Sequence, residues 1–321
     1  MTNYLIIGYG NISKRHLNNL SKIKKKKIIF ILTRKKNIIN NNKSVFFIND
    51  ISEIDQRYFD SIFICTGSNE HIKTANRYLK YSNNIFIEKP LSNNLDNLKK
   101  FINNVKKKNI NIFIGYNLIF LESLIKLKKI IQKNKKNLIK INVKTSYDLR
   151  LWRNNFDYKN SVSASKEKGG GVLLELSHDL HYLIWMLGKP KWVICHLSKL
   201  SNLSVNVEDN AFLIVGFRDV IVNVELDFIN KFYQREVSLL TDKTFYKWNY
   251  KKNSIIKIVK NKKKLVFKSN KNFNHTYIDE LKFFLNEKGN NFKLLDIAFL
   301  TNKLIHCAKI SNLKNSKKVI I

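Results

Sequence analysis

The first third of the chain alternates short apolar, β-branched runs with stretches in which apolar residues recur at helical spacing. Strands that are apolar throughout and separated by helices are typical of a parallel sheet covered on both faces. Residues 1–116 are therefore predicted to form a doubly wound α/β domain. The predicted strands cover residues 4–7, 28–32, 45–48, 61–65, 85–87 and 110–114, and the predicted helices cover residues 12–23, 70–81 and 95–107.

From residue 117 onward the apolar pattern changes to longer alternating runs. A helix is predicted at 121–132, a strand at 138–147, a helix at 171–187, and two strands at 207–217 and 220–228 joined by the Arg218-Asp219 turn. Two helices at 277–287 and 294–310 follow. Consecutive alternating strands with short connections indicate an antiparallel sheet. Residues 117–321 are thus predicted to form an α+β domain with an open, mainly antiparallel sheet, its last helix packing back on the first domain.

The net charge of +35 comes from 51 Lys and 8 Arg against 24 acidic residues. Such a balance can indicate a partner that is a nucleic acid or an anionic membrane. However, the chain also has 44 Asn but only 5 Ala and 2 Pro, the pattern that AT-rich codons impose on any protein. Nucleic-acid sites favour Arg, and Arg is scarce here. No nucleic-acid or membrane partner is expected; a nucleic-acid binder remains an alternative that rests on charge alone.

Other features of the composition narrow the class of protein. The hydrophobic content of 44 % and the length of 321 residues can supply two cores. Three cysteines without CxxC spacing predict neither a disulfide framework nor a structural zinc site, and no metal is expected. No signal-peptide pattern and no apolar run of transmembrane length is found, so a cytoplasmic location is expected.

A glycine-rich turn follows the first predicted strand. The segment Gly8-Tyr9-Gly10-Asn11-Ile12-Ser13 leads directly into a helix. Gly8 permits a sharp turn, and Gly10 lets the backbone approach a pyrophosphate that sits at the positive end of the helix. Ser13 replaces the usual third glycine. Gly8, Gly10, Asn11 and Ile12 are therefore predicted to bind a dinucleotide, which makes the first domain a Rossmann domain.

The end of the second predicted strand carries Thr33 and Arg34 where a carboxylate would normally bind the adenosine ribose. A hydroxyl and a guanidinium suit a 2′-phosphate, so the cofactor is NAD or NADP with a slight preference for NADP. The alternative is that this loop is basic only because the whole chain is lysine-rich.

Two further motifs follow later strands of the same domain, Cys65-Thr66-Gly67-Ser68-Asn69-Glu70-His71 and Glu88-Lys89-Pro90. In order, they resemble the turn and the E-K-P tripeptide of the Gfo/Idh/MocA family of nicotinamide-dependent oxidoreductases. Segments 115–117, 169–178, 277–280 and 295–298 extend the resemblance over nearly the whole chain. It implies a Rossmann domain, a substrate-binding and oligomerisation domain, and a cofactor site that includes Thr66, Asn69, His71, Glu88 and Lys89.

Lys89 is the candidate proton donor and acceptor. Oxidation of an alcohol by a nicotinamide requires removal of the hydroxyl proton, and a lysine with a lowered pKa can accept it. The resemblance implies that Pro90 follows a cis peptide bond that directs Lys89. Glu88 is expected to orient the nicotinamide ribose.

The helix after the glycine triplet carries three further candidate catalytic residues, Glu175, His178 and Asp179. Family members usually place an acid and then a histidine one helical turn later on the same face. Here the histidine is displaced by one position, so either His178 or Lys89 alone handles the proton, and Asp179 is an alternative ligand of a substrate hydroxyl. His178 could equally be a core residue, and His181 is expected to be structural.

The loop before this helix offers polar and aromatic groups to a polyhydroxylated ligand. The predicted substrate contacts are Asn117, Trp152, Arg153 and Tyr158. Tyr116 and Asn117 could instead have packing roles, and Arg153 could form a surface salt bridge.

The leading hypothesis is an NAD(P)-dependent dehydrogenase or reductase acting on a sugar, sugar nucleotide, sugar acid or cyclitol, in surface-polysaccharide or nonulosonate-type metabolism. The alternative is a non-catalytic sensor of dinucleotide or sugar on the same fold. A homo-oligomer, dimer or tetramer, is expected, since the exposed face of an open sheet is a natural dimer surface.

Overall fold

The computed structural model describes residues 1–23, 26–35, 38, 40–54, 58–152, 156–286 and 292–321. The chain divides into two compact units. The first comprises Met1–Asn117 and Asn274–Phe299, and the second comprises Leu118–Phe273 and Leu300–Ile321. The C-terminal helix α8 (Phe292–Leu313) begins in the first unit and ends in the second.

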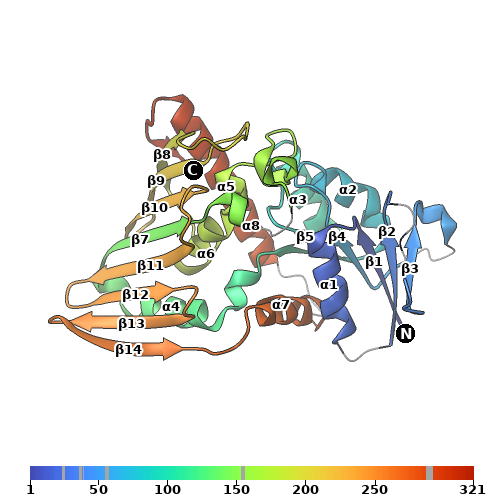
Figure 1. Ribbon diagram of the computed structural model, residues 1–321, viewed down its shortest axis with the longest axis horizontal. Coiled ribbons are helices and arrows are strands. Elements are labelled where there is room, and N and C mark those ends of the chain that lie inside the picture. The colour runs from blue at the N-terminus through green and yellow to red at the C-terminus, as the bar shows by residue number, and fades with distance from the viewer. Residues whose placement is uncertain (24–25, 36–37, 39, 55–57, 153–155, 287–291) are drawn as a thin grey trace. The chain divides into compact units, whose positions relative to one another are not determined.

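The first unit is built on a six-stranded sheet in the order β3-β2-β1-β4-β5-β6 (Figure 1). Every neighbouring pair in it is parallel, as predicted. The strands are β1 (Thr2–Ile7), β2 (Lys27–Leu32), β3 (Val45–Ile48), β4 (Ser61–Ile64), β5 (Asn84–Glu88) and β6 (Asn111–Gly115). The helices that accompany them are α1 (Asn11–Ser21), α2 (His71–Tyr78), α3 (Leu98–Lys107) and α7 (Asn274–Asn286).

Burial of apolar side chains explains why these segments form these elements. All four residues of β4 and all five of β6 are buried, as expected for strands covered on both faces. In α3 the buried side chains are Leu98, Phe101, Ile102 and Val105, which recur at helical spacing and join the core beside the sheet. The lysines of α3 lie on its other face.

The second unit contains a nine-stranded sheet in the order β14-β13-β12-β11-β7-β10-β9-β8-β15. Its pairs are antiparallel except for β7 and β10, which run parallel, so the prediction of a mainly antiparallel sheet is confirmed. The strands are β7 (Leu138–Ser146), β8 (Trp192–Ser198), β9 (Asn210–Gly216), β10 (Ile221–Asp227), β11 (Gln234–Thr241), β12 (Phe245–Asn249), β13 (Ser254–Val259), β14 (Lys262–Lys268) and β15 (Val319–Ile320).

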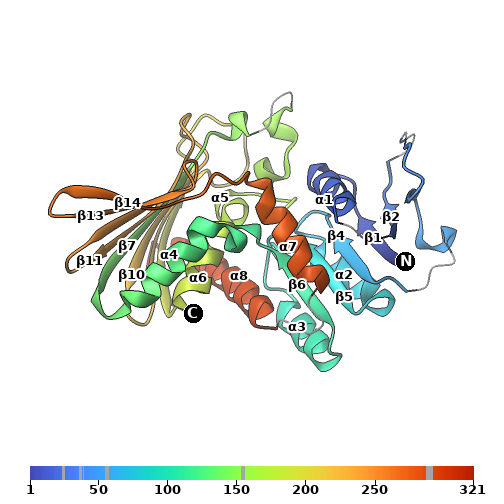
Figure 2. The same ribbon diagram turned by 90° about the horizontal axis from the view of Figure 1, so that it is seen from below.

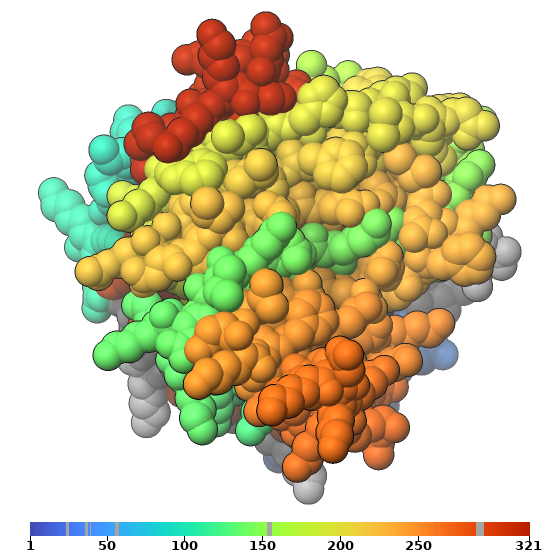
Figure 3. Space-filling view, turned by 90° about the vertical axis from the view of Figure 1, so that its left-hand side faces the viewer, coloured from blue at the N-terminus to red at the C-terminus, as the bar shows by residue number. Residues whose placement is uncertain are grey.

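Helices cover one face of this sheet and leave the other exposed. The helix α4 (Glu122–Lys133) packs on the covered face (Figure 2). There the indole nitrogen of Trp248 donates a 2.7 Å hydrogen bond to Ser123. On the opposite face the strands lie side by side at the surface (Figure 3). That face exposes Phe212, Ile214 and Ile221 among polar side chains.

One predicted helix is broken in the structure. The expected single helix at 171–187 is two helices, α5 (Val172–Glu175) and α6 (Ser177–Leu187), and Leu176 between them has a ψ of 19°. Residues 172–187 contain no Gly or Pro that would signal this break. Helical spacing therefore cannot be used to place Glu175 and His178 on one face.

Candidate cofactor and substrate sites

The turn after β1 requires glycine at position 8. Gly8 has a φ of +93°, and a Cβ added there would lie 2.9 Å from the carbonyl oxygen of Cys65, which follows β4. The amide of Gly8 donates to the carbonyl of Leu32 at the end of β2. The carboxyl ends of β1, β2 and β4 thus meet at this residue, which is where an open parallel sheet binds its ligand.

Gly10 differs from Gly8 because nothing crowds it. It is the N-cap of α1, its φ of −97° is ordinary, and an added Cβ would meet no atom within 4 Å. The first turn of α1, which includes exposed Asn11 and half-buried Ile12, holds no acidic residue. Buried Ser13 donates from its hydroxyl to the carbonyl of Gly10 at 2.8 Å and so fixes the turn. Unblocked amides at a helix N-terminus with no negative charge suit a pyrophosphate.

Thr33, Arg34 and Lys35 follow the end of β2. Thr33 is buried, and its hydroxyl oxygen accepts a hydrogen bond from the amide of Lys35 at 3.2 Å. Arg34 is exposed and makes no ion pair with any residue that the structure describes. The guanidinium of Arg34 is therefore available to an anion at the same edge of the sheet as Gly8.

His71 links the turns that follow β4 and β5. Its Nδ1 lies 2.8 Å from the carbonyl oxygen of Pro90, and its Nε2 lies 3.1 Å from that of Thr66. Burial lowers the pKa of His71 below its usual range, and the two carbonyl partners act in the opposite direction. The Lys89-Pro90 bond is cis, and Lys89 is half-buried. His71 therefore lies between the backbone that follows β4, at Thr66, and the backbone that follows β5, at Pro90.

Glu88 takes part in a buried pair that the sequence did not suggest. Its Oε1 lies 2.5 Å from Nε2 of His16 on α1, and both side chains are buried. Glu280 on α7 is completely buried, and neither of its carboxyl oxygens has a hydrogen-bond partner among the described residues. Burial, reinforced by the charge of Glu88, raises the pKa of Glu280 well above its usual range. Burial therefore favours the neutral, protonated form of Glu280.

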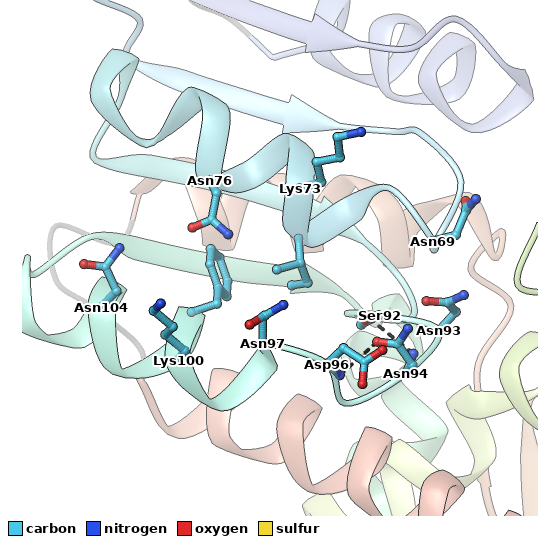
Figure 4. Close-up of a pocket in the computed structure, with 12 residues that line it drawn as sticks. Asn69, Lys73, Asn76, Ser92, Asn93, Asn94, Asp96, Asn97, Lys100 and Asn104 are labelled. Carbon is cyan, nitrogen blue, oxygen red and sulfur yellow. Dashed lines mark hydrogen bonds between the residues drawn. The ribbon is translucent and has the colours of Figure 1, made fainter.

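A polar cavity of about 760 Å³ lies between α2 and α3 (Figure 4). Its lining is rich in asparagine, with Asn69 at one end and Asn104 at the other (Figure 4). Asn69, a predicted cofactor ligand, is exposed at the start of this cavity.

In the second unit, Asp179 is held in a buried network. It accepts hydrogen bonds from the hydroxyls of Thr145 at 2.8 Å and Tyr182 at 2.7 Å, and it pairs with the Arg235 guanidinium at 3.1 Å. Asp179 is completely buried. These bonds occupy the carboxylate of Asp179 and give it a structural role in the sheet-to-helix packing.

Glu175 and His178 are both half-buried, Glu175 as the last residue of α5 and His178 as the second residue of α6. His181, by contrast, is 3 % exposed, and burial lowers its pKa to about 3. It is therefore neutral at pH 7, in agreement with a core position.

The glycine triplet is explained by close packing. A Cβ on Gly170 would lie 2.2 Å from the carbonyl oxygen of Val162, and one on Gly171 would lie 2.5 Å from a carboxyl oxygen of Glu208. Gly171 also has a φ of +105°. Burial raises the pKa of Glu208. Local packing alone thus requires glycine at positions 170 and 171 of this motif.

Three of the four predicted substrate contacts, Asn117, Trp152 and Tyr158, have protein partners. Asn117 is buried and donates to the hydroxyl of Thr276 on α7 at 2.7 Å. The indole of Trp152 donates to the carbonyl of Tyr147, and the hydroxyl of Tyr158 accepts from the amide of Ser204. Arg153 lies outside the described residues.

Comparison with known proteins identifies the family. Residues 2–116 match "Oxidoreductase family, NAD-binding Rossmann fold", and residues 140–245 match "GFO/IDH/MocA C-terminal domain". The chain belongs to the Gfo/Idh/MocA oxidoreductase family. The resemblance noted in the sequence is thereby confirmed, as is the combination of an NAD-binding Rossmann fold with this C-terminal domain.

Individual relatives are distant. The chain is 28 % identical over 192 residues to the uncharacterized oxidoreductase YrbE of Bacillus subtilis. The aligned region covers 57 % of this chain and 53 % of that protein. It is 26 % identical over 132 residues to myo-inositol 2-dehydrogenase of Thermotoga maritima, or 40 % of each chain. The match thus spans about half or less of these relatives. The crystal structure of myo-inositol 2-dehydrogenase from Lactobacillus plantarum has a TM-score of 0.79 at 18 % identity and covers 100 % of this chain and 99 % of that one, which shows a shared fold.

Among the residues that the structure describes, no helix is both long and apolar enough to cross a membrane. In the same residues, no three His, Cys, Asp or Glu side chains are grouped so that they could hold a metal ion.

Proposed function

We propose that the protein is an NAD(P)-dependent dehydrogenase or reductase that acts on a hydroxyl-bearing carbon of a sugar or cyclitol. The observation that carries the proposal is the open backbone at Gly10, at the N-terminus of a helix without acidic residues in its first turn. Gly8 and Gly10 fit the pyrophosphate of a dinucleotide, and no side chain of the described residues fills the place next to Gly10.

Lys89 performs the proton transfer in this proposal. The bound nicotinamide supplies the hydride acceptor in oxidation and the hydride donor in reduction. As the carbinol C–H bond breaks, Nζ of Lys89 accepts the hydroxyl proton and the oxygen becomes a carbonyl; in reduction Lys89 returns that proton. His71 and the buried His16–Glu88 pair support the turn that carries Lys89, because they bond to residues on both sides of it.

The second unit is assigned substrate recognition. Half-buried Glu175 and His178 can exchange hydrogen bonds with hydroxyl groups, whereas Asp179 is occupied by Arg235 and acts as a positioning residue. The partial match to a myo-inositol 2-dehydrogenase supports a sugar or cyclitol as the substrate class.

The cofactor is proposed to be NADP in preference to NAD. Exposed Arg34 follows β2, where the adenosine ribose of a dinucleotide would lie, and no carboxylate stands beside it in the sequence. A comparison of Michaelis constants decides the point, because a clear preference for NAD would contradict the role of Arg34.

The experiment that tests the function compares two variants. Gly10→Ala adds a methyl group that meets no protein atom, so the fold should be as stable as before while NAD(P)H binds at least tenfold more weakly, measured by fluorescence titration. Lys89→Ala should bind NAD(P)H normally and lose turnover with every active member of a panel of inositols and sugars. Normal cofactor binding by Gly10→Ala, or retention of most turnover by Lys89→Ala, would refute the proposal.

We also propose that the chain forms a homo-oligomer through the exposed face of the nine-stranded sheet. Phe212, Ile214 and Ile221 are 47 %, 40 % and 50 % exposed there. A double variant, Phe212→Lys with Ile214→Lys, should shift the mass measured by light scattering to that of a monomer. An unchanged mass would place the interface elsewhere.

A further inference from the structure

Lysine is concentrated far above its average in one segment of the second unit. Residues 243–271 contain 11 Lys and no Asp or Glu. At the density of the whole chain, with 51 Lys and 24 acidic residues in 321, these 29 positions would hold fewer than five Lys and about two acids. A codon bias acts on the whole gene, so it accounts for the average and not for this local excess.

Part of the excess has a structural explanation. Lys262, Lys263 and Lys264 lie in β14, which is the edge strand of the sheet. Lysine on an edge strand prevents pairing with another sheet. This explanation does not cover Lys251 and Lys252, which lie in the turn between β12 and β13.

These two lysines line a cavity of about 690 Å³, within the usual range for small-molecule sites. Lys268 and Lys271 are the other basic residues of the lining, which also contains the polar residues Asn253, Asn270, Asn272, Ser254 and Ser269 and the apolar residues Ile256, Leu265 and Phe273. Lys271 is paired with Glu122 on α4. Lys251, Lys252 and Lys268 make no ion pair within the part of the chain that the structure describes. Three positive charges therefore converge on the cavity without a protein counter-charge.

The walls of the cavity, residues 251–256 and 265–273, are held in place by contacts within the first segment and between the two. Asn249 accepts a hydrogen bond from the amide of Lys252, and the carbonyl of Asn253 accepts one from the amide of Ser269. The ring of Phe273 stacks on Tyr250 at 4.3 Å. A ligand would thus meet a preformed site, which lowers the entropic cost of binding.

Asn253 gives a second and independent indication of a ligand. It is 4 % exposed and has a φ of +43°, and its side-chain Oδ1 has no hydrogen-bond partner among the described residues. A buried polar atom without a partner costs free energy, which a ligand that donates a hydrogen bond would recover. A hydroxyl is such a donor.

We propose that this cavity binds a small ligand that carries more than one phosphate group and at least one hydroxyl, such as a bisphosphorylated sugar. Lys251, Lys252 and Lys268 bind the phosphates, and Asn253 accepts a hydrogen bond from the hydroxyl. The site is separate from the dinucleotide site at Gly10, since all its residues belong to the second unit.

The test is calorimetric titration of the full chain with fructose 1,6-bisphosphate and with pyrophosphate in 150 mM salt. The triple variant Lys251→Gln, Lys252→Gln, Lys268→Gln should bind both probes at least tenfold more weakly. The matched control is Lys189→Gln, Lys191→Gln, Lys199→Gln, three exposed lysines of the same unit. It removes the same charge and should change affinity less than twofold. Equal losses in the two triples, or no binding by the unmodified chain, would overturn the proposal.

Two further comparisons sharpen the result. Asn253→Gly suits the positive φ and removes the side chain, so it should weaken the sugar bisphosphate and leave pyrophosphate unchanged. Equal effects on the two probes would overturn the assignment of the hydroxyl. Gly10→Ala should leave the lysine-dependent binding intact, which keeps this test separate from that of the proposed function. A single-stranded oligonucleotide that displaces the bisphosphate at equal phosphate concentration would overturn the assignment to a small ligand.

Discussion

Replacing His181 should make the second unit less sensitive to acid. His181 lies on α6, is 3 % exposed, and has a pKa lowered by burial from 6.5 to about 3. Between about pH 3 and pH 6.5, His181 is therefore protonated in the unfolded chain and unprotonated in the folded chain. Stability is lost as the pH falls from 6.5 toward 3, and this residue contributes no pH dependence above about pH 7.

The size of the effect follows from the interval between the two pKa values. Each pH unit within it costs about 1.4 kcal/mol, so lowering the pH from 7 to 4.5 should cost the unmodified chain about 2.5 kcal/mol through His181 alone. His181→Gln keeps a neutral, hydrogen-bonding side chain of similar size at both pH values. The variant should therefore escape this part of the acid loss, whatever the substitution costs at pH 7.

Tryptophan fluorescence during urea unfolding provides the assay. The four tryptophans are Trp152, Trp185, Trp192 and Trp248, and all belong to the second unit, so the signal reports the unit that contains His181. The unfolding free energies of both chains at pH 7 and pH 4.5 give a double difference in which other titrating groups cancel. If the two chains lose the same stability between these pH values, His181 is not the buried neutral base described above.

Three further substitutions test individual contacts. Gly8→Ala places a side chain at a positive φ and against the backbone of Cys65, so it should destabilise the first unit by about 2 kcal/mol or more. Hydrogen exchange of β1 measures this loss. Protection of β1 equal to that in the unmodified chain would contradict the strain. Asp179→Asn leaves Arg235, whose side chain is only 11 % exposed, without a counter-charge, so it should cost about 3 to 5 kcal/mol in fluorescence-monitored unfolding. A loss below 1 kcal/mol would show the pair to be unimportant. Burial raises the pKa of Glu280 above its unfolded value of 4.5, so the stability of the first unit should fall as the pH rises above 4.5. Glu280→Gln should remove that fall, and an unchanged pH dependence would rule the explanation out.

The architecture of the first unit was largely predictable because its strands are apolar throughout. Each of the six predicted strands lies within two residues of an observed one, for example 45–48 against β3 (Val45–Ile48). The second unit was harder. Strands such as β14 carry lysines on an exposed edge and lack the apolar signal, and the break at Leu176 depends on packing that no local pattern records.

The candidate cofactor site was predictable where it depends on the chain close to one turn, and not where it depends on distant partners. Gly8, Gly10 and the Glu88-Lys89-Pro90 tripeptide could be identified as candidate residues from sequence motifs alone. His16 is 72 residues from Glu88 in the sequence, and Glu280 lies on a helix near the C-terminus. The sequence signal for both residues was a titratable side chain on the apolar face of a helix. Burying such a side chain costs free energy unless it has a partner or changes its protonation state.

The arginines carry more information than the total charge. Two of the arginines that the structure describes, Arg150 and Arg235, lie where several hydrogen bonds converge, and a lysine cannot reproduce their planar fork. Arg150 binds Asp148 through Nε and Nη2, and Arg235 binds both Asp179 and Thr145. These arginines are explained by the fold alone.

Arg34 is different, because it is exposed at the end of β2 and forms no ion pair with any described residue. A guanidinium retained there without a structural reason favours a planar anion, as the 2′-phosphate of NADP would supply. Arg34→Lys keeps the charge and removes the fork, so it should raise the dissociation constant for NADPH about tenfold, or about 1.4 kcal/mol, and leave that for NADH unchanged. Lys35→Gln is the control for charge on the same loop and should affect both cofactors equally. If Arg34→Lys weakens neither cofactor, the arginine is retained by chance and the preference for NADP has no support.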